Sequence, residues 1–236
     1  MNKPTQALIA FLIAILVIAT EYFFRHYVMF WFPQIGTWRV NDMVSLFIGY
    51  FLLLAFLGFL TNVHWIKEWA GIRRALYDCI LTWKYIRWIL AMVLCIQVFS
   101  LLDRLLFSRF TLPFFVSPYR NPAIWMSGFA PFLKAFSLIA VNGLFVPVAE
   151  EFLWRGLVQP RFESAFGASI AVGATAVLFS LKHVAVDASF NRFTMAVAFG
   201  VICGMLSLRK GWNASAALHV FINTASSVTV LVLGKI

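Results

Sequence analysis

The sequence predicts an all-α protein, a polytopic bundle of about seven transmembrane helices with room for interfacial helices, in a single membrane-embedded domain, 1–236. Three observations predict it. Of the 236 residues, 62% are hydrophobic and 12% are charged, against about 25% charged in a typical soluble domain. The 26 Phe and 9 Trp are more than a water-soluble core of this size can bury. Apolar runs long enough to cross a bilayer recur along the whole chain.

Seven apolar segments carry this prediction. They are expected at 6–24, 43–63, 88–106, 132–149, 168–186, 193–208 and 214–233. The first is interpreted as a retained span, because no small-residue cleavage site ends it. The proline-rich stretch 109–131 is expected to form a loop, with or without a short interfacial helix. The loop 62–87 is either a solvated basic loop or an amphipathic helix in the membrane plane, because these apolar residues recur with a helical period: Trp65, Ile66, Trp69, Ile72 and Leu76.

The net charge of +10 indicates membrane lipids as partners and not nucleic acid. The basic residues lie mostly between the apolar runs, where they anchor helix ends at lipid headgroups. By the positive-inside tendency, the basic loop 62–87 is expected to be cytoplasmic. The amino terminus then lies on the same side and the carboxyl terminus outside. The three cysteines are dispersed, which argues against a disulfide framework and a thiolate metal site.

A pair of acidic residues stands at the predicted end of the fourth span. Glu150 and Glu151 are two of only nine acids in the chain, and Arg155 follows four residues after Glu151. Ionisable groups at membrane depth cost about 2.5–3.5 kcal/mol each on insertion scales. Residues four apart share a helix face, so Glu151 is expected to pair with Arg155 and to leave Glu150 free to face a cavity. Two neighbouring carboxyls also separate each other's proton affinities, which suits general acid–base chemistry.

Two later apolar segments carry further polar pairs at the same spacing. Phe179 and His183 share one helix face, and His219 and Asn223 share another. Lipid penalises such groups, so the three clusters are expected to face inward together. Each cluster alone also has a structural interpretation: a solvated helix end, a packing histidine, or an interhelical hydrogen-bond pair.

Other polar residues are interpreted as structural. Glu21 and Arg25 are expected to pair at the membrane interface, and Asp103 and Arg104 to form a helix-end pair. The remaining members of this group lie in predicted loops or at helix ends: His26, His64, Asp187 and Arg192.

The ordered set EExxxRG, FxxxH and HxxxN resembles the CPBP family of intramembrane proteases. That family includes the type II CAAX prenyl endopeptidases and bacteriocin-processing or immunity proteins. Each motif is weak alone, but the three in order, each on its own apolar segment, are specific. The motif-bearing helices 132–233 are expected to form the catalytic part of the domain. The matching residues are Glu150, Glu151, Arg155, Gly156, Phe179, His183, His219 and Asn223.

The resemblance implies an endopeptidase that hydrolyses a peptide bond of a membrane-associated protein or peptide. It implies these catalytic residues: Glu150, Glu151, His183, His219 and Asn223. A glutamate and a histidine of the first two motifs activate a water, and His219 and Asn223 stabilise the oxyanion. Arg155 orients the carboxylates by a bidentate pair, and Phe179 shapes the pocket.

A metal-free, glutamate-type mechanism without a cofactor is favoured over a zinc metalloprotease. The chain has no HExxH motif, and asparagine is an unusual zinc ligand. The alternative zinc ligands are Glu150, His183 and His219.

The chain is short for a eukaryotic prenyl-processing enzyme, so a bacterial inner-membrane protein is expected. The substrate, and whether a prenyl group is recognised, stay open. One rival function is a proton-coupled transporter, since buried Glu and His also build proton relays. A proton relay has no evident need for the asparagine beside the imidazole, and the sequence shows no inverted repeat. The other rival is a non-catalytic immunity or binding protein of the membrane.

Overall fold

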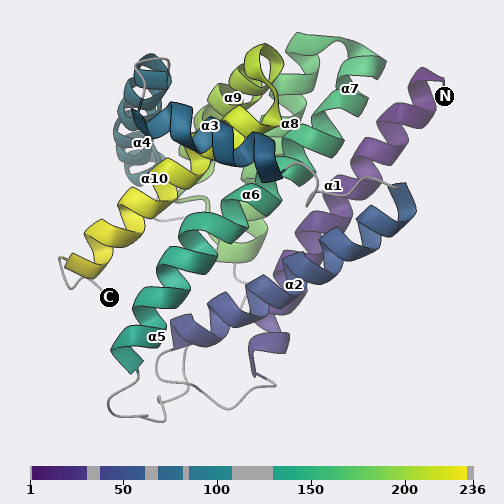
Figure 1. Ribbon diagram of the computed structural model, residues 1–236. Coiled ribbons are helices and arrows are strands. Elements are labelled where there is room, and N and C mark those ends of the chain that lie inside the picture. The colour runs from purple at the N-terminus through teal and green to yellow at the C-terminus, as the bar shows by residue number, and fades with distance from the viewer. Residues whose placement is uncertain (1, 31–37, 62–68, 82–84, 108–129, 233–236) are drawn as a thin grey trace.

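The structure is a computed structural model that describes residues 2–30, 38–61, 69–81, 85–107 and 130–232. In these ranges every regular element is helical, which confirms the all-α prediction (Figure 1). The principal helices are α1 (Lys3–His26), α2 (Trp38–Thr61), α3 (Trp69–Leu81), α4 (Ile86–Phe107), α5 (Ala130–Phe136), α6 (Val146–Glu151), α7 (Gln159–Phe166), α8 (Ala168–Asp187), α9 (Phe193–Lys210) and α10 (Trp212–Val232). A short 3-10 helix, η1 (Val28–Phe30), follows α1, and two π-helical segments, η4 (Ser137–Phe145) and η5 (Phe152–Val158), flank α6. The predicted loop 109–131 lies largely outside the described residues, as does His64.

Six helical stretches of the described chain are long and apolar enough to cross a membrane. They are Lys3–His26, Val40–Leu60, Ile86–Phe107, Ser137–Phe166, Ala168–Asp187 and Phe193–Lys210. They coincide with the first six predicted spans and identify an integral, multi-pass membrane protein. The seventh predicted span, 214–233, is the 21-residue helix α10, which is not among these six.

The predicted end of the fourth span at residue 149 is wrong. The helix runs without a break from Ala130 to Phe166, so Glu150 and Glu151 lie in its middle. Hydropathy falls at the two glutamates, but their partners are protein groups, so the helix continues. Pro147 and Pro160 each follow a π-helical segment. Proline has no N–H to donate into the helix, and the wider π turn accommodates it close to the acidic pair. Single π turns are frequent at functional sites.

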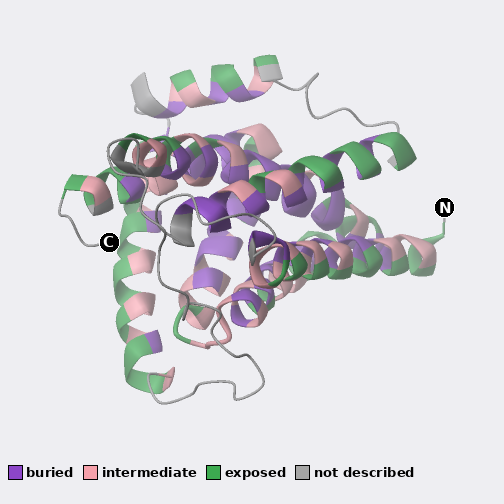
Figure 2. Ribbon diagram, turned by 90° about the horizontal axis from the view of Figure 1, so that it is seen from below, coloured by how far each residue is buried: buried purple, intermediate pink, exposed green. Residues whose placement is uncertain are grey.

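The interior is closely packed, and the outer helix faces are apolar. Figure 2 shows buried residues concentrated between the helices and exposed residues on the outer faces. The largest fully buried side chains include Trp154, Phe162 and Phe179, but also the charged Arg155 and Lys182. Apolar residues such as Phe59 (85% exposed) face outward, as expected for helices that are surrounded by lipid. Ionic groups therefore occupy the protein interior, where they need partners.

Helix α3 lies within 62–87, where an amphipathic helix was one of the two expectations, and it crosses in front of α10 in the view of Figure 1. Ile72 is fully buried and clusters with Val148 and Val220. The apolar face thus packs on protein. Trp65 and Ile66 lie outside the described residues. The amino-terminal end of α1 lies at the upper right of Figure 1, and α10 finishes at the left.

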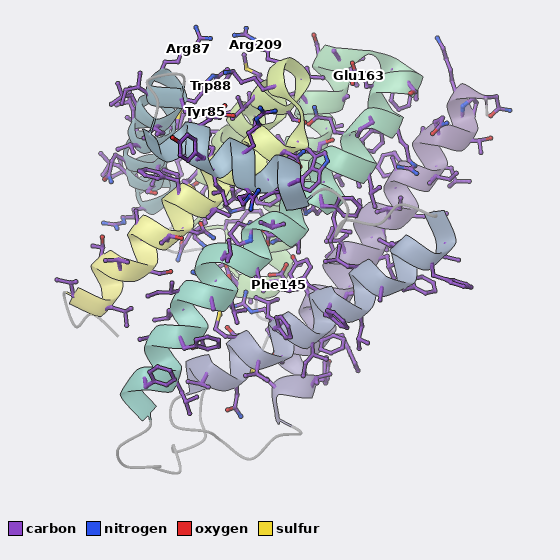
Figure 3. All side chains as sticks on the ribbon, viewed as in Figure 1. Tyr85, Arg87, Trp88, Phe145, Glu163 and Arg209 are labelled. Carbon is purple, nitrogen blue, oxygen red and sulfur yellow. The ribbon has the colours of Figure 1, made fainter. Side chains whose placement is uncertain are left out.

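Aromatic and basic side chains gather where α4 begins and α9 ends (Figure 3). The guanidinium carbons of Arg87 and Arg209 lie 6.0 and 5.6 Å from the ring centre of Trp88. The ammonium of Lys210 lies 4.8 Å from the ring centre of Tyr85. Such a belt is typical of helix ends at the lipid headgroups.

Candidate active site

The three sequence motifs meet at one cavity of about 340 Å³ between the helices. Glu150 reaches it from α6, Phe179 and His183 from α8, and His219 and Asn223 from α10. The cavity is partly open and has both polar and apolar walls. Four hydrogen-bonding side chains from three separate helical segments therefore face a single cavity.

Glu151 and Arg155 do not line this cavity, because they lie behind it in the protein interior. The Arg155 Nη1 donates to Glu151 Oε1 over 3.1 Å, and Nη2 donates to the carbonyl oxygen of Gly200 over 3.1 Å. The Ser215 hydroxyl donates to the other oxygen of Glu151. The predicted Glu151–Arg155 pair is present, but the expected bidentate geometry is wrong, since the second arm of Arg155 binds the α9 backbone.

His219 lies between the two glutamates. Its Nδ1 is 3.0 Å from Glu151 Oε1, and its Nε2 is 3.9 Å from Glu150 Oε2. An ionised carboxylate only accepts hydrogen bonds, so this pattern assigns a proton to Nδ1. The ring also packs edge-on against Phe199, with centroids 4.6 Å apart. Glu151 therefore fixes the orientation of His219 and leaves Nε2 toward Glu150.

Glu150 was expected to be free, and this expectation is wrong. The Lys182 ammonium donates to Glu150 Oε1, and the Tyr50 hydroxyl lies 3.1 Å from the same oxygen. Lys182 is the residue before His183, and its side chain is fully buried. One feature of the sequence could have predicted this contact: Lys182 lies inside an apolar span, where a cation needs a partner.

The amino-terminal helices also reach the site. The predicted Glu21–Arg25 pair is present, with 3.5 Å between Nη1 and Oε1, and both side chains are mostly buried in the protein. Arg25 makes its closer contacts with both oxygens of Asp42, at 2.8 and 2.9 Å. Glu21 and Arg25 line the cavity. Their inward position depends on how α1 packs against α2 and α8, which no local spacing predicts.

Asn223 and His183 both line the cavity, and each has hydrogen-bonding capacity that the described residues do not use. The Asn223 Nδ2 donates one hydrogen bond to the carbonyl oxygen of Asn142 over 3.2 Å, so its second hydrogen is available. The buried Nδ1 of His183 has no hydrogen-bond partner among the described residues. The His183 ring meets Phe179 edge-on at 4.9 Å. Phe179 also lies 4.8 Å from the Arg155 guanidinium carbon, so it separates the cavity from the buried cation.

Asp103 was expected to pair with Arg104 at a helix end, and this is wrong. Its carboxylate accepts hydrogen bonds from the backbone N–H groups of Thr194 and Met195 at 2.8 and 2.9 Å, and from the Thr194 hydroxyl at 2.6 Å. Asp103 on α4 therefore caps the first turn of α9, where negative charge is favoured.

Three other polar residues at the edge of the site have structural contacts: His26, Asp187 and Arg192. His26 Nε2 lies 2.8 Å from the carbonyl oxygen of Val186, and Arg192 pairs with Asp187.

The alternative zinc ligands expected from the sequence were Glu150, His183 and His219. Among the described residues, no three His, Cys, Asp or Glu side chains lie close enough together to hold a metal. Glu150, one of the alternative ligands, already binds the Lys182 ammonium.

Cys79, Cys95 and Cys203 are free thiols. Burial raises the pKa of Cys79 to about 11, so this thiol is protonated and unreactive near neutral pH.

The fold and the site define a class: a multi-pass helical membrane protein with buried acidic and imidazole groups around one cavity. A family model described as type II CAAX prenyl endopeptidase Rce1-like matches residues 132–225. This segment contains all three motifs, and the match confirms the resemblance that they predict. The segment 132–225 is thus similar to a family of membrane proteases. No curated protein and no solved structure matches the chain.

Proposed function

We propose that this protein is an intramembrane endopeptidase of the glutamate type, which cleaves a membrane-anchored protein or peptide. The observation that carries the proposal is the shared cavity. Glu150, His183 and His219, together with Asn223, line one space of about 340 Å³. A base, hydrogen-bond donors and room for a water beside a peptide bond are what hydrolysis requires.

Glu150 is the proposed general base. A water in the cavity gives a proton to the Glu150 carboxylate while its oxygen attacks the carbonyl carbon of the scissile peptide bond. The tetrahedral intermediate then collapses, the C–N bond breaks, and Glu150 returns the proton to the leaving amine. His183 also lines the cavity and is proposed as a second group that holds this water.

His219 and Asn223 are the proposed stabilisers of the oxyanion. The free hydrogen on Asn223 Nδ2 is a neutral donor of the kind that acyl-transfer sites use. With Nδ1 bonded to Glu151, His219 donates from Nε2 in its protonated form, and the Glu151 carboxylate compensates the positive charge. Glu151 thus affects the reaction by orienting His219, and Arg155 affects it by holding Glu151.

The proposal includes no metal, because the Lys182 ammonium already neutralises Glu150 and the cavity-lining donors do not form a three-residue ligand set. The substrate class follows from the surroundings of the site. A cavity enclosed by apolar helices, with lipid-facing outer surfaces, is reached by a chain segment held at the membrane.

The test is cleavage of a membrane-tethered reporter peptide by the purified protein in proteoliposomes. Glu150→Gln keeps the size of the side chain but removes the base, so kcat is expected to fall by about 10²–10⁴-fold. Glu163→Gln is the matched control, because Glu163 is an exposed carboxylate on α7, outside the cavity (Figure 3). Full activity of Glu150→Gln would refute the assignment. Proton flux driven by a pH gradient without peptide turnover would favour the transporter instead.

A further inference from the structure

We propose that Lys182 is a positioning residue for the general base, and that Glu21 on α1 is its second anchor. The proposal rests on the proposed function, since it concerns the state of Glu150 during hydrolysis. It extends the site beyond the three motifs, because the FxxxH pattern specifies Phe179 and His183 and leaves the intervening positions open.

Two groups bridge the same pair of carboxylates. The Lys182 ammonium contacts Glu150 Oε1 and lies 2.9 Å from Glu21 Oε2. The Tyr50 hydroxyl donates to Glu21 Oε2 over 2.6 Å and lies 3.1 Å from Glu150 Oε1. The Oε1 atom of Glu150 is thereby held on the protein side. The other oxygen, Oε2, faces His219 at 3.9 Å.

Lys182 does not touch the space in which the reaction occurs. Its side chain is fully buried and is not among the residues that line the cavity, whereas Glu21 and Glu150 both line it. The ammonium nitrogen also lies 5.0 Å from the ring centre of Phe179, which stands between it and the open space. Lys182 therefore acts on the substrate only through Glu150.

The charges around Glu150 explain why a cation is needed there. The titratable groups around it come from four helices and from its own neighbour: Glu21, Arg25, Tyr50, Lys182, His219 and Glu151.

The other cations near the site have carboxylate partners of their own. Arg25 makes its closer contacts with Asp42, and Arg155 pairs with Glu151. Lys182 is thus the cation that separates the Glu21 and Glu150 carboxylates. Without it, two carboxylates share one hydroxyl, and one of them takes up a proton.

The experiment measures kcat and KM for the reporter peptide with Lys182→Met, Lys182→Arg and the double variant Glu21→Gln/Lys182→Met. Lys182→Met is expected to lower kcat by about 10–1,000-fold, the range that a neighbouring opposite charge commands, with KM nearly unchanged. Lys182→Arg keeps the charge and recovers most of the activity. The double variant removes the competing carboxylate as well, so its kcat rises about tenfold over Lys182→Met.

A second readout needs no substrate. Infrared spectra of the protein in lipid should show a protonated carboxylic acid band in Lys182→Met that is absent from the wild type, from Lys182→Arg and from the double variant. If Lys182→Met does not fold, Lys182→Gln, which keeps a donor without the charge, is measured in the same way.

The outcomes separate the two proposals. If Glu150→Gln is inactive while Lys182→Met keeps wild-type kcat, the positioning role is wrong and the proposed function stands. If neither the arginine nor the double variant recovers activity, Lys182 has a packing role only, which also overturns the inference. If the wild type cleaves no reporter, the proposed function fails and the infrared band alone decides whether Lys182 holds Glu150 ionised.

Discussion

His219 is held on one side and open on the other. Glu151 accepts from Nδ1 at 3.0 Å, while Nε2 and the free hydrogen of Asn223 are turned toward the cavity. Asn223 is also fixed, because its amide donates to the backbone of Asn142 on the neighbouring helix. Preorganised donors of this kind need no rearrangement during the reaction, which is the physical basis of oxyanion stabilisation.

Asn223→Ala should therefore lower kcat by about 10²–10³-fold with little change in KM, because the lost donor acts on the transition state. Kinetics with the reporter peptide measure the effect. Ser226→Ala is the control, since Ser226 lines the same cavity but belongs to no motif, and it should behave like the wild type. A large rise in KM with unchanged kcat for Asn223→Ala would instead indicate a role in substrate binding.

The motif residues could be predicted because their spacing is local. Residues four apart on a helix share a face, so the pairing of Glu151 with Arg155 and the common orientation of His219 and Asn223 follow from the sequence. The sequence showed that Lys182 lies in an apolar span, but it did not show which residues Lys182 contacts. Tyr50 and Glu21 meet Glu150 only after α1 and α2 pack on the central helices, and no spacing along the chain encodes that contact.

Among the helices, close approach of α8 and α9 supports the site. Gly200 on α9 accepts a hydrogen bond from Arg155 with its carbonyl oxygen. A Cβ at this position would lie 2.8 Å from the Cα of Ala176 on α8. The lack of a side chain thus allows the two backbones to come together and lets Arg155 reach across to α9.

Gly200→Ala is expected to destabilise the protein by about 1–3 kcal/mol, the usual cost of overpacking, because the clash is with backbone. Gly173→Ala is the matched control, since a Cβ there meets nothing within 4 Å and alanine favours a helix more than glycine by up to about 1 kcal/mol. Thermal unfolding in detergent measures both. Equal midpoints for the two variants would show that the α8–α9 contact tolerates expansion.

Hydropathy predicted the existence of the helices better than their ends. The fourth span was ended at residue 149 because two glutamates follow, yet these side chains have buried partners and the helix extends to Phe166. For 62–87, a solvated loop and an amphipathic helix were both open; the structure has the helix α3, and its apolar face covers Val148 and Val220. In both cases tertiary contacts replace the solvent or lipid that the sequence alone suggests.

For the whole molecule, the number of membrane crossings depends on α10. Several of its polar residues face the interior: Ser215 and His219 are buried, and Asn223 lines the cavity. Such a helix can cross the bilayer without exposing those groups to lipid. Counted with the six other spans, it gives the seven crossings that the sequence predicts.

Epitope tags at the two termini should therefore lie on opposite sides of the membrane, with the amino-terminal tag on the same side as α3. Protease protection in sealed vesicles of both orientations measures this, and the basic residues of 62–87 predict the cytoplasmic side for α3. A single cysteine introduced at exposed Tyr77 on α3, in a background without the three native cysteines, serves as an internal reference for labelling from each side. Tags on the same side would mean an even number of crossings. In that case α10 would not span, and His219 and Asn223 could not meet Glu150 at membrane depth.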